Sequence, residues 1–375
     1  MPNININVVD NTTVSYSGRE IVVFVPNEDS LVLPTDLKDK NDFVLLTDSN
    51  KLGSFSATAK SNKTYLYAKA IVDSGLQALI GPSVESVDEN LLLDKNEYNI
   101  KFLTSGTKGT IKVDGETVTT ATFKKLLGIA ASRRDCTVVA DIDAGTATVK
   151  EVYDALNESN TFKDLTMDNL RWAALYYTQS AYTNGAADIA KLGDLAFLQG
   201  YGKQYKIGKQ WESIAGVARG TVSIPDDAVV SKYIVDTNVQ TTSGISFNAV
   251  CDVRPYGPTI WGDRTLFKNS GLKASSFFSI MNMVTDISKR CYAASIENTF
   301  ESNSDVTWTN YKSRISTLLD EMVGAYKVAA YSIKRVPTDA RATIACKIHI
   351  IPIEPVEDFD ITVILENADA TIEMN

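Results

Sequence analysis

The last third of the chain carries the most regular hydrophobic pattern in the sequence. Apolar side chains recur at helical spacing over residues 275–298 and again over residues 305–328, so both segments are predicted to be amphipathic helices. Asp305 follows Ser304, a residue type that often caps helices, which indicates where the second helix begins. Three strand patterns follow, at residues 328–335, 342–353 and 359–366. This end of the chain is therefore predicted to be a unit of helices and strands.

The first part of the chain shows short apolar strand patterns that alternate with helix patterns. Strands are predicted over residues 20–25, 98–119 and 136–142, and helices over residues 64–78 and 121–132. An Asp–Gly step after Asp114 predicts a hairpin corner, because glycine adopts the positive φ that a tight turn needs. Alternating helices and strands are typical of an α/β layer. The predicted fold class is therefore a mixture of α+β and α/β.

Three segments in the middle of the sequence are harder to assign. Residues 170–177 fit either a helix or a strand. Residues 184–209 are rich in glycine and lysine and are predicted to form a surface excursion. Residues 211–219 contain many small side chains and are predicted to form a short helix that packs closely against a neighbour.

The two ends of the sequence carry isolated strand patterns. Ile4, Ile6 and Val8 alternate with asparagines, but no hairpin turn supplies a partner strand nearby. A lone amphipathic strand at a terminus must fray, fold back or pair with another molecule. From Glu354 to the end there are seven acidic residues and no basic ones. That segment is either a solvated tail or an arm that meets a basic strip on a neighbouring subunit.

Length and composition narrow the class of protein. A single core stops growing at about 250–300 residues, so a chain of 375 residues is expected to form two domains. The net charge of −9 disfavours nucleic acid and anionic membrane as general partners. Lys203, Lys206 and Lys209 alternate with aromatic residues, and in an acidic chain this pattern favours a protein contact or a solvated loop over a nucleic-acid site. No membrane-spanning helix and no signal peptide are expected, because neither pattern occurs.

Residues that could carry chemistry are few. The one histidine, His349, lies in a strand pattern and is predicted to face a neighbour or solvent; no Gly-x-Ser-x-Gly motif accompanies it. Neither a phosphate-binding loop nor a dinucleotide motif has the required glycine spacing. Four cysteines lie far apart and are predicted to be buried and reduced, in a chain made in a reducing cytoplasm: Cys136, Cys251, Cys291 and Cys346. We therefore expect no enzyme activity, no cofactor and no metal site.

One segment carries a specific motif. Residues 253–266 read Val-Arg-Pro-Tyr-Gly-Pro-Thr-Ile-Trp-Gly-Asp-Arg-Thr-Leu. We expect a turn at Gly257, burial of Trp261 on a core strand, and close backbone approach at Gly262. Arg264 can hold carbonyl or carboxylate oxygens with its fork of donors, and Thr265 follows it in the motif. The segment resembles the Trp-Gly-x-Arg-Thr-Leu motif of the contractile phage tail sheath family, in which these residues are structural.

Other segments resemble the same family in the same order along the chain. They are Asp135–Ala140, Ala174–Tyr177, Ser213–Arg219 and Ile350–Ile361, and the resemblance covers roughly residues 120–375. It favours a strand for the ambiguous Ala174–Tyr177.

The resemblance implies a two-domain sheath protomer. The expected parts are an N-terminal strand arm (1–18), a subtilisin-like α/β domain (19–250), a C-terminal α/β domain facing the tube (251–357) and a C-terminal strand arm (358–375). The resemblance implies that arm residues Ile4, Ile6 and Val8, and Ile361, Val363 and Leu365 at the other end, pair with sheets of neighbouring subunits by strand addition.

The resemblance also implies partners and a role. They are other copies of the chain in a helical homopolymer with hexameric rings, the tail tube, the baseplate and the tail terminator, without nucleic acid or membrane. The sheath would assemble in the host bacterial cytoplasm, belong to the virion tail, and contract to drive the tube through the host envelope. The alternative is another structural component of a phage tail or injection machine, such as a tube, terminator or adhesin.

Overall fold

The computed structural model describes residues 21–108, 111–114, 117–144, 147–158, 162, 164–178, 182–184, 187–189, 193–222, 245–267, 273–338 and 343–355. The two predicted arms, with Ile4, Ile6, Val8, Ile361, Val363 and Leu365, lie outside these residues.

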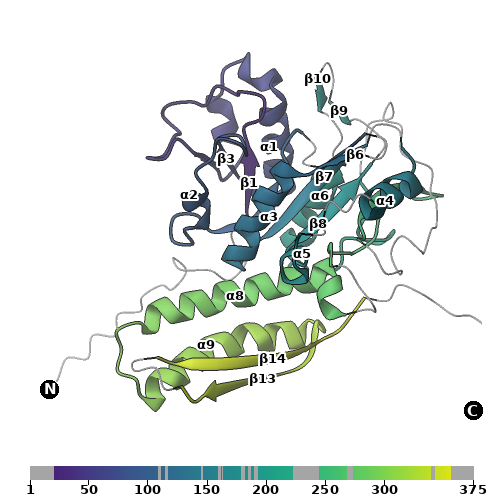
Figure 1. Ribbon diagram of the computed structural model, residues 1–375. Coiled ribbons are helices and arrows are strands. Elements are labelled where there is room, and N and C mark those ends of the chain that lie inside the picture. Colours follow the sequence, from purple (N-terminus) through teal and green to yellow (C-terminus); the bar gives the residue numbers. More distant parts are fainter. Residues whose placement is uncertain are drawn as a thin grey trace, which may run out of the picture.

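A large, mainly parallel sheet forms the centre of the described structure (Figure 1). Its strand order is β12-β11-β8-β7-β4-β1-β3-β2, and a β5–β6 hairpin adds to β7. The strands are β1 (Val22–Pro26), β2 (Val44–Leu46), β3 (Gln77–Gly81), β4 (Ile100–Thr104), β5 (Ile111–Asp114), β6 (Thr117–Thr119), β7 (Thr137–Asp143), β8 (Ala173–Tyr177), β11 (Asn248–Val253) and β12 (Gly257–Trp261). The strands from β11 to β3 run parallel, and the two end strands, β12 and β2, pair antiparallel.

Helices cover both faces of this sheet. They are α1 (Lys63–Ser74), α2 (Glu89–Leu93), α3 (Ala121–Arg133), α4 (Val149–Glu158), α5 (Met167–Leu170) and α6 (Gly193–Lys206). Successive residues of β7 enter different cores: Val138 packs with α3 and α4, and Val139 packs with α1 and α6. A central strand covered on both faces is mainly apolar, which explains the nearly continuous apolar runs in the sequence. A small separate hairpin pairs β9 (Tyr182–Asn184) with β10 (Ala187–Ile189).

The C-terminal part forms a second layer below the sheet (Figure 1). It comprises α8 (Phe278–Asn298), α9 (Asp305–Gly324) and an antiparallel pair, β13 (Val328–Val336) with β14 (Ala345–Pro352). Both predicted helices are confirmed, and so is the cap, because the Ser304 hydroxyl accepts a hydrogen bond from Thr307 N at 3.3 Å. The first two predicted strands of this part are also confirmed, whereas the third lies outside the described residues.

Most elements predicted for the first part of the chain are confirmed, including the antiparallel pairing of β5 with β6, the helices α1 and α3, and a strand at Ala174–Tyr177, which lies within β8. The domain boundary predicted between residues 250 and 251 falls inside β11, which belongs to the large sheet.

Two assignments in the middle of the chain are wrong. The predicted surface excursion at 184–209 contains the largely buried helix α6, whose glycines allow close packing: a Cβ on Gly202 would lie 2.5 Å from Ser74 Oγ of α1. The predicted helix at 211–219 is a series of turns, in which Gly216 has φ +72°. A residue with that φ leaves the helical region, so the chain turns there.

The prediction that all four cysteines are buried is wrong for two of them. Cys136 and Cys251 are buried, while Cys291 on α8 and Cys346 on β14 are half-buried, and all four are free thiols. His349 is exposed on β14 opposite Ser332, as the strand pattern predicts.

Candidate assembly surface

The β13–β14 hairpin has one covered face and one open face. Ile333 of β13 and Ile348 of β14 lie opposite each other and pack with the apolar residues of α8 and α9. Tyr331, on the same face, donates a hydrogen bond to Asp320 of α9. Because side chains alternate along a strand, the neighbouring residues point away from the helices. Among them, Lys334, Lys347 and Ile351 are exposed.

The hairpin also has two open edges. In the described part of the chain, β13 and β14 pair with each other and with no other strand. Each strand therefore presents a row of main-chain N–H and C=O groups along its outer edge. Such an edge is a ready template for a further strand from another chain. The hairpin can thus accept one strand on each side.

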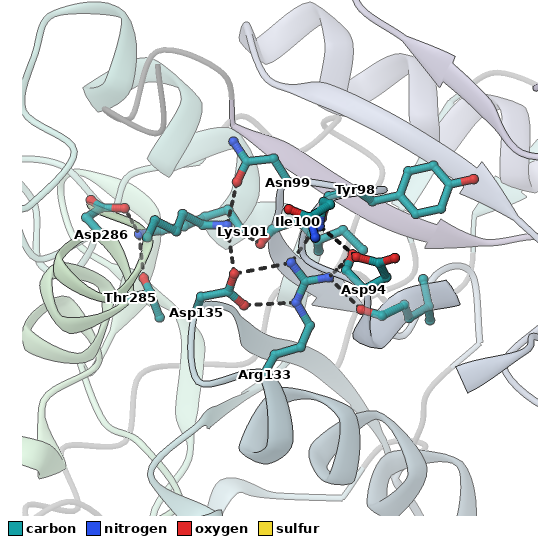
Figure 2. A network of polar contacts seen from close by, with 12 residues as sticks. Asp94, Tyr98, Asn99, Ile100, Lys101, Arg133, Asp135, Thr285 and Asp286 are labelled. Carbon is teal, nitrogen blue, oxygen red and sulfur yellow. Dashed lines mark hydrogen bonds and ion pairs between the residues drawn. The ribbon is translucent and has the colours of Figure 1, made fainter. Parts of the chain in front are cut away.

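A buried polar network fixes this layer to the large sheet (Figure 2). Lys101 of β4 lies beside Asp286 of α8, and the two side chains are 1% and 5% exposed. The Lys101 ammonium also donates to Asn282 O at 2.7 Å and to Thr285 Oγ1 at 2.6 Å. Asp286 Oδ2 in turn accepts a hydrogen bond from Trp211 Nε1 at 2.8 Å. One buried lysine thus ties β4 to a whole turn of α8.

A second part of the network joins α8 to α3. Lys289 of α8 donates to Asn99 Oδ1 at 2.6 Å and to Ile100 O at 2.7 Å, and its Nζ lies 3.6 Å from Asp135 Oδ2. Arg133 of α3 holds both oxygens of Asp135, at 2.9 and 3.2 Å (Figure 2). Asn99 lies directly before β4, and Asp135 lies just before β7. Helix α8 therefore lies across the amino-terminal ends of these two strands.

Burial and charge act against each other in this network. Burial lowers the pKa of Lys289 to about 8, although the nearby Asp135 carboxylate opposes that change. Burial alone would raise the pKa of Asp135, but Lys289 and Arg133 hold it below its ordinary value. A buried charge is tolerated only when it is paired and hydrogen-bonded, and each of these groups is.

The motif residues lie where the sheet meets α8. Gly257 has φ +82° at the start of β12, and Trp261 ends that strand. The Arg264 guanidinium stacks on the Phe277 ring, 4.8 Å from its centroid, and Arg264 is 2% exposed. Thr265 Oγ1 donates to Ser275 O at 2.8 Å. The motif therefore fixes the start of α8 against the edge of the sheet.

The burial of Trp261 at this junction departs from the sequence-based prediction. Trp261 is half-buried and not fully buried; it packs against the core from the edge strand and lines a cavity of about 540 Å³ together with Trp211 and Met283. Gly262 has φ +135°, a backbone conformation that other residues rarely adopt.

Sequence reasoning missed Asn248. This buried residue of β11 donates from its side chain to Arg264 O at 2.9 Å and Leu175 O at 3.2 Å, and accepts from Arg264 N at 2.7 Å. A single amide thus joins β11 and β8 to the motif. The sequence feature that could have revealed this residue is a polar side chain within an apolar strand pattern.

The described residues contain no group of three or more histidine, cysteine or acidic side chains placed to hold a metal ion. Within the same residues, no helix combines the length and apolar character needed to cross a bilayer.

Neither a protein-family model nor a curated protein sequence matches this chain. Solved structures do match. The sheath complex of the extracellular contractile injection system PVC, in its contracted state, is 15% identical with a TM-score of 0.65, covering 94% of this chain and 92% of that chain. The contracted helical sheath of the anti-feeding prophage is 14% identical with a TM-score of 0.61, covering 94% and 93%. A sheath tail protein from Listeria innocua is 7% identical with a TM-score of 0.51, covering 89% and 95%.

These matches place the chain, over nearly its whole length, in the fold shared by contractile sheath proteins. The resemblance seen in the sequence is thereby confirmed at the level of fold.

Proposed function

We propose that this chain is a structural subunit of a contractile sheath that polymerises by exchanging strands between neighbouring copies. The observation that carries the proposal is the β13–β14 hairpin, which is anchored on one face and open at both edges. A heterologous contact of this kind joins each copy to the next, and it produces a helical polymer where the repeated rotation does not close into a ring.

The solved structures support this reading because they cover the chain almost end to end. Two of them are sheaths in a contracted state, and a third match is a baseplate complex of the anti-feeding prophage. We infer from these proteins that the chain assembles with itself and lies next to a baseplate in an injection particle. A tail tube inside the sheath and a terminator at its end are further proposed partners.

The arms proposed for strand exchange are residues 1–18 and 358–375. Their alternating apolar residues suit addition to a sheet edge, because one side of an added strand would face the helices under the hairpin. We propose that the part built on the large sheet, which includes β11 and β12, lies farther from the tube, and that α8, α9 and the β13–β14 hairpin lie nearest to it. Contraction would use energy stored in the extended lattice, so the proposal needs no nucleotide and no catalytic residue.

Deleting residues 1–15 tests the strand-exchange model. We expect the truncated protein to remain a folded monomer by circular dichroism and size-exclusion chromatography, and to form no tubes in negative-stain electron micrographs. The full-length protein, with a tail tube protein added where a template is needed, should form hollow, cross-striated tubes. Tubes formed by the truncated protein would remove the N-terminal arm from the model.

A further inference from the structure

Two lysines lie directly opposite each other on the open face of the hairpin. Lys334 of β13 is the cross-strand partner of Lys347 of β14, and both are exposed. Directly opposed residues have Cβ atoms about 4.5–5.5 Å apart, and like charges at such a pair destabilise the sheet. Elsewhere in the described structure, exposed lysines such as Lys69 and Lys150 pair with a carboxylate one helical turn away.

No carboxylate compensates this pair within the described residues. Neither Lys334 nor Lys347 has an ion pair there. Arg335, the next residue, points to the other face and binds Asp305 at 3.0 Å. The open face of the hairpin carries no acidic side chain, and His349 is its only other titratable group. The face is therefore positively charged at the place where the proposed function adds strands.

The chain itself contains a segment of complementary charge. Residues 354–375 hold seven acidic residues and no basic ones. Alternate residues of a strand point to opposite sides, so Phe359 and Ile361 would share one side and Asp358 and Asp360 the other. With the apolar side turned to the helices, the carboxylates would lie on the same face as the two lysines.

The N-terminal arm carries much less negative charge. Residues 1–18 contain one acidic side chain, Asp10, and asparagines occupy the positions that alternate with Ile4, Ile6 and Val8. The lysine pair would therefore distinguish between two arms that both satisfy the main-chain groups of an edge. Specificity of this kind comes from charge complementarity more than from the total affinity.

We infer that Lys334 and Lys347 form a recognition surface for the acidic C-terminal segment of a neighbouring copy of this chain. This inference rests on the proposed function, and it adds the side chains that select one arm and make its binding depend on salt. Ion pairs exposed to solvent weaken as salt rises, because the Debye length falls from about 10 Å at 0.1 M to about 3 Å at 1 M.

Peptide binding to the full-length protein tests the inference without requiring polymerisation. The probe is a fluorescein-labelled peptide of residues 356–375, and its matched control carries amides in place of Glu357, Asp358, Asp360 and Glu366. At low salt we expect fluorescence anisotropy to give about tenfold tighter binding for the acidic peptide, a difference of about 1.4 kcal/mol. In 0.5–1 M salt the two peptides should bind alike.

Protein variants identify the surface. K334E/K347E should lose the preference for the acidic peptide, and K334M/K347M should bind both peptides equally at every salt concentration. The control K60E/K203E makes the same charge change at exposed positions on the α/β part, and it should bind both peptides as the wild type does. Circular dichroism verifies that each variant is folded.

The outcomes separate this inference from the proposed function. Equal binding of both peptides to the wild type, or no binding of either, would overturn the lysine surface. A preference for the acidic peptide that survives in K334M/K347M would also overturn it, because the charge would then be recognised elsewhere. The deletion of residues 1–15 tests strand exchange itself, and the peptide-binding results do not.

Discussion

Lys101 and Asp286 form a buried ion pair between β4 and α8, two elements that are 185 residues apart in the sequence. The pair is buried, and the indole of Trp211, itself buried, donates a hydrogen bond to the same carboxylate. The placement of the C-terminal layer therefore depends on a polar contact as well as on apolar packing.

We expect Lys101→Met to destabilise the protein by about 3–5 kcal/mol, because it leaves the Asp286 charge buried without its cation. Urea unfolding followed by tryptophan fluorescence measures this free energy, and Trp211 reports directly on the junction. The control is Lys69→Met, which breaks an ion pair with Asp73 whose side chains are 43% and 47% exposed and should cost at most about 0.5 kcal/mol. Similar small losses in both variants would contradict a closed junction.

Asp194 at the start of α6 predicts a particular dependence of stability on pH. Its carboxylate is fully buried, accepts hydrogen bonds from Tyr67 and Ser105, and has a pKa raised to about 7 by burial. Between pH 4 and 7 the folded state then holds a proton that the unfolded state has lost, so this group's contribution to stability falls as pH rises.

Asp194→Asn removes that titration. As pH rises from 4 to 7, the free energy of unfolding of the wild type should therefore fall relative to that of D194N, by on the order of 3–4 kcal/mol. Comparing the two proteins at each pH removes the contribution of groups that titrate in both, such as Asp135. A difference that stays constant over this range would mean that Asp194 is ionised throughout.

Glycines of α6 and α3 predict opposite effects of the same substitution. A Cβ on Gly202 would lie 2.7 Å from the main-chain oxygen of Ser74, so Gly202→Ala should force α1 and α6 apart and cost about 1–3 kcal/mol. Gly128 lies within α3 with open space around it, so Gly128→Ala should stabilise by about 0.5–1 kcal/mol. Thermal unfolding of the two variants checks the signs, and a stabilising Gly202→Ala would show that the helices are not in close contact.

The four thiols should differ in their reactivity. Burial raises the pKa of Cys136 to about 11, and Cys251 is also buried, so both should resist Ellman's reagent at pH 8 in the native protein. Cys346 is half-buried and should react first, a phase that Cys346→Ser removes. In denaturant all four thiols should react. Rapid native labelling of Cys136 would contradict its place in the core.

The sequence predicts best those elements whose burial follows a simple period. Helices α8 and α9 each bury one continuous stripe, so apolar residues recur at helical spacing. The central strands are mainly apolar because both faces are covered. The motif at Trp261 marked the junction of the sheet with α8, although the degree of burial of Trp261 depends on its place at the sheet edge.

The misses have a shared cause, which is contact between distant parts of the chain. Gly200 and Gly202 look like loop residues in isolation, but they are small because Ile214 and Ser74 pack against them. Lys101 looks like an interruption of a strand until Asp286 is brought beside it by the fold. No local pattern contains the partner in either case, so helix α6 and the buried network emerge only from the three-dimensional structure.

The two open edges of the β13–β14 hairpin have a consequence for how a polymer would terminate. If every interior subunit inserts its two arms into neighbouring copies and accepts two arms in return, all hairpin edges inside the lattice are paired. If both arms also reach toward the same end of the polymer, the two outermost rings differ: one keeps unpaired edges and the other keeps unpaired arms. The polymer would therefore have chemical polarity, and the proteins that cap its two rims would need opposite features, a strand to offer at one and an edge to offer at the other.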